Sequence, residues 1–178
     1  MPDQPAGKTE QAVLATFNKM VLEDRFDDIR VADLVRESDV GRSTFYDHFR
    51  DKHDVLLQSM AGIFGILASV LEPDCDISKV EGILKHFEEH RPATRQMMNS
   101  PTMTVITKGL TAEMTRHLPE SLTIPAIFVA QQLAEAELSL IRSWVTTASD
   151  ITASELASAI RQSLQGLRQG YQVTLPHA

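Results

Sequence analysis

The sequence predicts an all-α protein, and three observations carry that prediction. Apolar residues recur at intervals of three and four along the chain, which is the spacing of one face of a helix. Capping patterns and prolines divide the chain into segments of helical length. No stretch shows the apolar-polar alternation of a half-buried strand. With 178 residues, the chain is long enough for one domain, or two small joined domains, with a sizeable core.

The first fifty residues predict three helices separated by short breaks. The expected elements are a helix starting near Thr9, a break at Phe26–Arg30, a helix over Val31–Val35, a turn over Ser38–Gly41 and a helix over Arg42–Phe49. Asp39 suits the turn because aspartate tolerates a left-handed backbone. Asp51 is then expected to cap a long helix from Lys52 to Leu71.

Prolines mark expected helix boundaries in the rest of the chain, because proline lacks the N–H that a helix interior needs. They predict helices near residues 77–90, 92–99 and 102–118, and a long one from Pro125 to about Ala148. The segment Thr152–Glu155 has the Thr-x-x-Glu form of a capping box and opens a last helix. Gly62 and Gly65 are expected to let another helix, or a ligand, approach closely, and helix packing is the simpler explanation.

Charge and cysteine content exclude several classes of protein. The chain has 17 Lys+Arg against 24 Asp+Glu, a formal net charge of −7, which excludes binding of nucleic acid through a global positive field. The single cysteine, Cys75, excludes an internal disulfide framework and fits a reducing cytoplasm, where we expect the protein to reside. The longest uncharged stretch, the 17 residues Val55–Leu71, falls short of the roughly 20 that cross a bilayer, so no membrane association is expected.

Two short helices joined by a tight turn and packed on a preceding helix form a helix-turn-helix unit. The helix over Arg42–Phe49 has the composition of a recognition helix, since Phe45 and Phe49 can anchor it while its polar residues bond to DNA. Arg42 can bind guanine bidentately. Lys52, at the start of the next helix, can share a phosphate with backbone N–H groups. The expected DNA-binding residues of this helix and the start of the next are Arg42, Ser43, Thr44, Tyr46, His48 and Lys52.

The segment from Ile29 to Leu57 resembles the DNA-binding domain of the TetR/AcrR family of transcriptional regulators. Its most specific part is the Thr-Phe-Tyr-x-His-Phe-x-x-Lys pattern over residues 44–52, and the match covers about residues 9–57. The Leu-Ile-Arg-Ser-Trp run at 140–144 is also similar to many members. The chain differs from the family's usual pattern at Ser38-Asp39, where Ala-Gly or Ala-Asn is common, and at Arg30, where a capping Thr is common. Arg30 loses that cap, and the resemblance makes it an expected DNA-binding residue, as a stronger partner for phosphate.

The resemblance implies a ligand-responsive transcriptional regulator, a repressor released from its operator by a small-molecule effector, and not an enzyme. It implies a homodimer on double-stranded operator DNA and no cofactor. Residues 1–50 would form the helix-turn-helix domain, and residues 51–178 the effector-binding and dimerisation domain. Tyr46 and Lys52 would hold phosphates. The last two helices would form the dimer interface, through Leu138, Ile141, Val145, Leu156, Ile160, Leu164 and Leu167.

A cluster of flexible apolar residues follows the long helix and is expected to line the effector site. Methionine adapts to irregular shapes, and small-molecule sites are mostly apolar. The expected lining residues are Phe64, Leu67, Phe87, Met97, Met98, Met103, Ile106, Leu110, Phe128 and Trp144. The alternative is that these residues are simply core.

The segment His86–His90 reads His-x-x-Glu-His, a pattern that places two histidines one helical turn apart near an acid. A catalytic zinc needs a third protein ligand, for which Glu113 and His117 are candidates. The alternative functions are therefore a metal-dependent hydrolase at this motif, a regulatory metal site, or a helical ligand-binding dimer that has lost DNA binding. The simplest interpretation of the motif is a solvated helix end with no metal.

Overall fold

A computed structural model describes residues 5–23, 26–99, 101–147 and 149–172. Within these ranges the chain is helical and forms no strand apart from an isolated bridge between Leu122 and Gln172, which confirms the all-α prediction. The helices are α1 (Pro5–Glu23), α2 (Val31–Glu37), α3 (Arg42–His48), α4 (Lys52–Ser59), α5 (Ala61–Ala68), α6 (Ile77–Glu89), α7 (Arg91–Asn99), α8 (Thr102–Arg116), α9 (Ala126–Thr146) and α10 (Ala153–Gln169). Two short 3-10 turns lie at Phe26–Asp28 and Ser69–Leu71.

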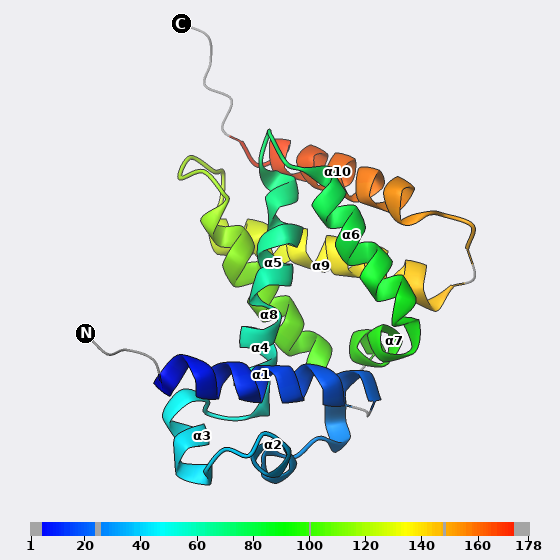
Figure 1. Ribbon diagram of the computed structural model, residues 1–178. Helices are drawn as coiled ribbons and strands as arrows, with labels where there is room; N and C mark the ends of the chain where they lie inside the picture. The colour runs from blue at the N-terminus through cyan, green and yellow to red at the C-terminus, as the bar shows by residue number, and fades with distance from the viewer. Residues whose placement is uncertain (1–4, 24–25, 100, 148, 173–178) are drawn as a thin grey trace, which may run out of the picture.

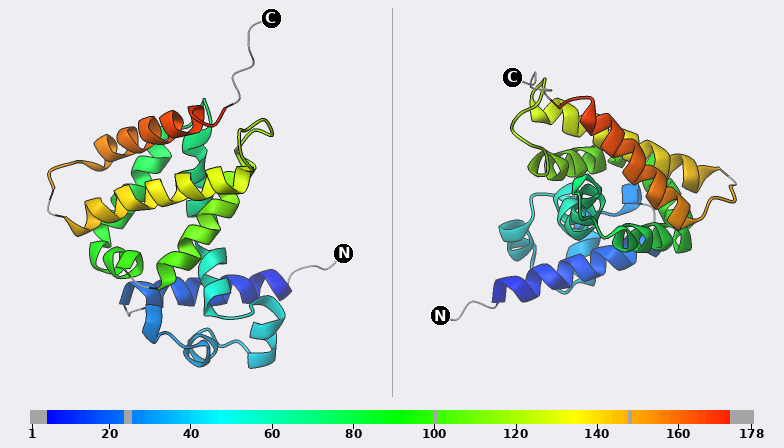
Figure 2. Two further views of the ribbon diagram at one scale, coloured as in Figure 1. Left: turned by 180° about the vertical axis from the view of Figure 1, so that it is seen from behind. Right: turned by 90° about the horizontal axis from the view of Figure 1, so that it is seen from above.

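The helices gather at two ends of the molecule. Figure 1 shows α1, α2 and α3 at one end and α5, α6, α9 and α10 toward the other, with α4 and α7 lying next to α1. α1 packs on α2, α3 and α4, and it also touches α7. At the other end α8 packs along α9, while α10 lies against both α9 and α6 (Figure 2). The first three helices therefore form a unit that meets the rest of the chain through α4 and α7.

Aromatic side chains hold the three-helix unit together. Phe17 of α1 meets Phe26 edge-on, with ring centroids 6.0 Å apart. Phe45 and Phe49 are both buried, and their ring centroids lie 5.4 Å apart. The buried pair anchors α3 against α1, as the spacing of these two residues predicts.

The local turn and cap signals of the sequence are confirmed. Asp39 has a φ of 52° and is the one non-glycine residue with positive φ among those described. The Asp51 carboxylate accepts hydrogen bonds from the backbone N–H groups of His53 at 2.8 Å and Asp54 at 3.0 Å. Thr152 and Glu155 form the reciprocal capping box at the start of α10. Each of these devices acts over four residues or fewer, which is why the sequence shows them directly.

The prediction of one long helix from Lys52 to Leu71 is wrong. The segment divides at Met60 into α4 and α5, and the two parts are bent by 47°. The Ser59 hydroxyl donates to the carbonyl of Leu56 at 2.9 Å, a local bond of the kind that weakens a helix. The bend lets α4 follow α1 while α5 follows α8. The tertiary contacts therefore override a continuous apolar pattern.

The expected role of Gly62 and Gly65 in close packing is also wrong. A Cβ atom added at either position meets nothing within 4 Å. The close approach occurs instead at Gly109 of α8, where an added Cβ would lie 2.5 Å from Cε2 of Phe64 and 2.8 Å from Cδ2 of Leu57. Gly109 is thus the position at which α8 presses against α4 and α5.

The other predicted boundaries agree with the structure to within a few residues. α1 starts at Pro5, earlier than the expected Thr9, and α9 ends at Thr146. The expected end near Ala148 lies outside the described residues. Within the described residues no single helix is both long and apolar enough to cross a membrane; the adjoining segments Lys52–Ser59 and Ala61–Leu71 reach that length only as a bent pair.

Candidate nucleic-acid interface and effector cavity

The turn between α2 and α3 sets the orientation of α3. The Ser38 hydroxyl donates to the carbonyl of Leu34 at 2.5 Å, and the N–H of Val40 donates to the carbonyl of Val35 at 3.3 Å. The left-handed residue Asp39 then reverses the chain, so that α3 begins at Arg42. The arrangement is a helix-turn-helix unit whose second helix packs through its phenylalanines.

The outer face of α3 carries the hydrogen-bonding groups that DNA binding needs. Arg42, Ser43 and Tyr46 are exposed, and Tyr46 retains 49% of its surface. The Arg42 guanidinium lies 5.9 Å from the centre of the Tyr46 ring. Thr44 and His48 are half-buried, so they lie toward the flanks of this face. The structure thus brings together Arg42, Ser43 and Tyr46 and sets the other two at its edge.

The charges around α3 are partly neutralised within the unit. Arg36 pairs with Asp33 at 2.9 Å, and Arg50 pairs with Asp54 at 3.6 Å. Arg30 is exposed at the N-cap of α2, and its side chain makes no capping bond, as expected. Among the described residues, Arg30 and Arg42 are the arginines of this surface without an ion pair, which leaves them available for phosphates or bases.

Lys52 does not offer the phosphate contact that the sequence predicts. Its ammonium donates to three backbone carbonyls, those of Phe26 and Asp27 at 3.0 Å each and that of Ile29 at 3.1 Å. The same ammonium lies 4.6 Å from the centre of the Phe26 ring. An ammonium has three N–H donors, so these carbonyls use all of them. Lys52 instead ties the start of α4 to the segment that leads into α2.

A cavity of about 250 Å³ lies where the three-helix unit meets the rest of the chain. We call it the boundary cavity. Its lining residues come from α1 (Phe17, Asn18, Val21, Leu22), from the α4–α5 bend (Leu56, Ser59, Met60, Ile63) and from α6 and α7 (His86, Phe87, His90, Ala93, Thr94, Met97). The residues from α1 and the α4–α5 bend were not expected from the sequence, since they lie far along the chain from α6 and no local signal joins them.

Most of the predicted effector residues are core residues instead. Phe87 and Met97 line the boundary cavity. The buried members are Phe64, Leu67, Met98, Ile106, Leu110 and Trp144, and each exposes 4% of its surface or less. Met103 borders a shallow depression between α8 and α9, and Phe128 is 61% exposed. A stripe of apolar residues predicts that one helix face is buried, but it does not show whether other core residues or a ligand cavity covers that face. The sequence therefore could not separate core residues from cavity-lining residues.

The predicted dimer residues are likewise inside the protomer. Leu138, Ile141, Val145, Leu156, Ile160 and Leu164 expose 5% of their surface or less, and Leu167 is half-buried. These side chains pack α9 and α10 against each other and against α6 and α8. Apart from Leu167, they are therefore not on the surface that a second copy would touch. The outer faces of α9 and α10 carry other residues, among them Ile127 and Phe128 at the start of α9.

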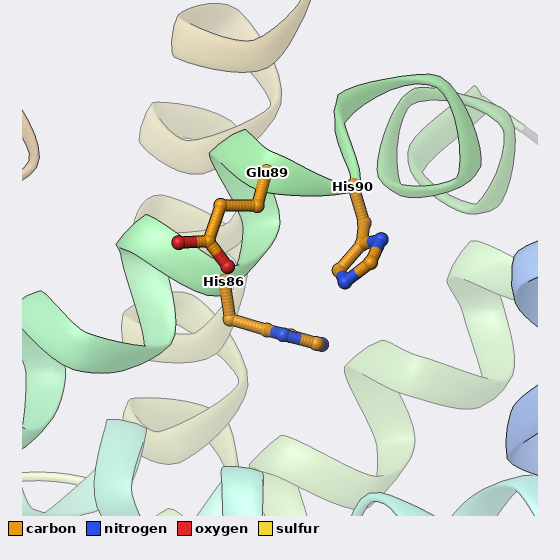
Figure 3. Close-up of side chains that lie close together, drawn as sticks. All are labelled: His86, Glu89 and His90. Atoms are coloured by element: carbon orange, nitrogen blue, oxygen red, sulfur yellow. The ribbon is translucent and has the colours of Figure 1, made fainter.

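The histidine motif forms a cluster, but without the distant ligands that the sequence suggested. His86, Glu89 and His90 converge at the end of α6, as Figure 3 shows. His117 instead contacts Glu72, with Nδ1 and Oε1 2.7 Å apart, and lies 3.7 Å from Glu113 through Nε2. Both residues that could have completed a hydrolase site are therefore engaged elsewhere.

Comparisons with known proteins agree with this architecture. No family model and no curated protein matches the chain. A TetR transcriptional regulator from Streptococcus agalactiae is 23% identical over 91% of this chain and 96% of that chain, with a TM-score of 0.58. A structure described as a TetR-family transcriptional regulator from Syntrophomonas wolfei is 16% identical over 95% and 99%, with a TM-score of 0.53. The dihydroxyacetone kinase operon activator DhaS is 15% identical over 93% and 98%, with a TM-score of 0.50. The chain therefore has the fold of the TetR-family transcriptional regulators.

Proposed function

We propose that the protein is a DNA-binding transcriptional regulator that acts as a homodimer and whose operator affinity depends on a small-molecule effector. The observation that carries this proposal is the exposed face of α3, where Arg42, Ser43 and Tyr46 stand on a helix anchored by buried phenylalanines. The solved structures of the same fold are described as transcriptional regulators, which supports a regulator over an enzyme.

In the proposed complex, α3 enters the major groove and its first residues meet the base edges. Arg42 is suited to bidentate contact with guanine, and the hydroxyl of Ser43 bonds to a base or a phosphate. Tyr46 and Arg30 bind the backbone, while Lys52 acts inside the protein by fixing the approach to α2. Two copies would place their recognition helices on half-sites about 34–36 Å apart.

The exposed apolar start of α9 supports a dimer surface on the outer faces of α9 and α10. Ile124 lies just before α9, and Ile127 and Phe128 lie in its first turn; they are 41%, 49% and 61% exposed. Large apolar side chains that remain exposed together favour contact with another protein surface. The buried stripe of α9 and α10 serves a different purpose, since it holds each protomer together.

The boundary cavity supports the effector role. It is bounded by α1 of the three-helix unit on one side and by α6 and α7 on the other. A ligand there would contact both parts, so its affinity would differ between two arrangements of those parts. Such a difference is what an effector needs to shift operator binding.

Titration of labelled DNA from the region upstream of the protein's own gene tests the proposal. We expect Arg42→Ala to weaken specific binding by about fivefold to 150-fold, because one bidentate base contact is worth about 1–3 kcal/mol. Arg116→Ala is the matched control, since Arg116 is exposed at the end of α8 and pairs with Glu113. Fluorescence anisotropy gives both affinities. Equal effects of the two substitutions, or no binding by the native chain, would contradict the proposal.

A further inference from the structure

Three side chains that bind metals meet at the C-terminal end of α6. The candidate ligand atoms of His86, Glu89 and His90 all lie within 4.8 Å of one another (Figure 3). The two imidazole rings are 4.7 Å apart between centroids. α6 ends at Glu89, and the N–H of His90, its C-cap residue, donates to the carbonyl of His86 at 3.1 Å. This bond closes the last turn and holds His90 one helical turn beyond His86.

The chemistry of this group fits a divalent transition-metal ion. Imidazole nitrogen and carboxylate oxygen are ordinary ligands of Zn²⁺, and imidazole also suits Ni²⁺ and Cu²⁺. Two atoms that each bind one ion at about 2.1 Å lie no more than about 4.2 Å apart, so the side chains need to close by only a small rotation. His86 and Glu89 are exposed, so solvent rather than packed core surrounds them. Within the described residues, neither imidazole is engaged in a side-chain hydrogen bond or ion pair.

The histidine cluster lies at the boundary between the three-helix unit and the rest of the chain. His86 and His90 line the boundary cavity, whose opposite wall includes Asn18 of α1. His90 is the last residue before α7, and the Thr94 hydroxyl donates toward its carbonyl at 3.2 Å. α7 in turn touches α1. A metal ion that fixes His90 would therefore restrain the junction of α6 and α7, and α7 is one of the helices that contact the three-helix unit.

We propose that His86, Glu89 and His90 form a regulatory site for a divalent transition-metal ion, and that occupation of this site changes the operator affinity of the protein. Three protein ligands leave a coordination position open, which suits a regulatory ion that exchanges with its surroundings. The part that concerns the operator rests on the proposed function. The part that concerns the ion stands on the geometry of α6 alone.

The chain contains its own reporter for the site. It has one tryptophan, Trp144. The guanidinium of Arg91, the residue after His90, lies 5.6 Å from the centre of the indole ring. Binding at His90 should displace this contact and change the tryptophan fluorescence, and Cu²⁺ or Ni²⁺ should quench it.

Calorimetric titration of the untagged full-length protein with Zn²⁺ tests the ion site. We expect one ion per chain, and an affinity at least about tenfold weaker in the double variant His86→Gln/His90→Gln. Glu89→Gln should weaken binding less, since it removes one ligand and leaves both imidazoles. His117→Gln is the matched control, because it makes the same change at a histidine that lies outside the cluster and contacts Glu72 and Glu113 instead. Absence of stoichiometric binding, or equal binding by the double variant, would overturn the proposal.

Operator titrations with and without Zn²⁺ test the regulatory part. We expect the ion to change the affinity of the native protein by about fivefold or more and to leave the double variant unchanged. If Zn²⁺ binds but the operator affinity stays constant, the regulatory part is wrong and the ion site stands. If Zn²⁺ binds but neither form of the protein binds DNA, the proposed function is wrong, and the calorimetric result shows that the site itself is not.

Discussion

Glu137 is the most unusual single residue of the protein. It lies on α9, it is 0% exposed, and neither of its carboxylate oxygens has a hydrogen-bond partner among the described residues. Burial raises the pKa of Glu137 well above its ordinary value, because a charge without a partner is costly in an apolar interior. The folded state therefore favours the protonated carboxyl.

This burial makes stability depend on pH in a defined direction. The unfolded chain releases the Glu137 proton near the ordinary value of 4.5, whereas the folded chain keeps it to higher pH. The free energy of unfolding contributed by this group is thus fully present below the unfolded pKa and is lost as pH rises toward the folded pKa. We expect Glu137→Met to raise the free energy of unfolding at pH 8 by about 1–3 kcal/mol, and by less at pH 5. Urea unfolding at both values measures this, and an equal effect at the two pH values would refute it.

Lys52 is a residue whose partners could not be predicted from its sequence motif. The family pattern places a lysine at this position, and the pattern is present. The three carbonyls that receive its N–H groups belong to residues more than twenty positions away. Only the packing of α4 against the segment that precedes α2 brings them within reach.

Gly62 of α5 and Gly109 of α8 allow the effect of intrinsic helix preference to be measured separately from the effect of packing. An added Cβ at Gly109 collides with Phe64, whereas one at Gly62 meets open space. We expect Gly109→Ala to lower the free energy of unfolding by about 1–3 kcal/mol, because the core must shift to admit it. Gly62→Ala should raise the free energy by up to about 1 kcal/mol, because alanine prefers the helix. Urea unfolding of the two variants, which make the same change, provides the comparison. Similar effects would show that packing at Gly109 is unimportant.

The two faces of the helix pair α9 and α10 should respond differently to substitution. Leu164 is buried within the protomer, and Phe128 is 61% exposed. We expect Leu164→Ala to cost about 2–5 kcal/mol of stability and to leave the oligomeric state unchanged. Phe128→Glu should leave the protomer folded and shift a dimer toward monomer, since it places a charge in the proposed interface. Light scattering together with circular dichroism separates the two results. A dimer that persists in Phe128→Glu would place the interface elsewhere.

The excess of acidic residues over the whole molecule is expected to limit the electrostatic contribution to DNA binding. Residues 1–55 hold eight basic and twelve acidic residues, and Lys52 is already engaged inside the protein. We expect weak non-specific binding and a modest dependence of operator affinity on salt. The slope of log K against log salt should correspond to fewer than about ten phosphates per dimer. Titrations at several salt concentrations give this slope, and a steeper one would require cations beyond those of the α3 surface.

The features that act over a few residues could be predicted from the sequence alone. The all-α class, the Asp39 turn, the Asp51 cap, the Thr152–Glu155 capping box and the pairing of Phe45 with Phe49 all follow from neighbours in the chain. These devices depend on backbone hydrogen bonds and helical periodicity, which are local. The histidine motif is of the same kind, since its three candidate ligands lie within five consecutive residues.

The tertiary structure decided what each buried face meets. An apolar stripe indicates that one side of a helix is buried. Only the packing of the helices determines whether core residues, a cavity or a second copy of the chain covers that side. For this reason Leu156 and Ile160 proved to be core, the long helix bent at Met60, and the close approach fell at Gly109. The boundary cavity is the clearest case, because its walls are helices that only the fold brings together.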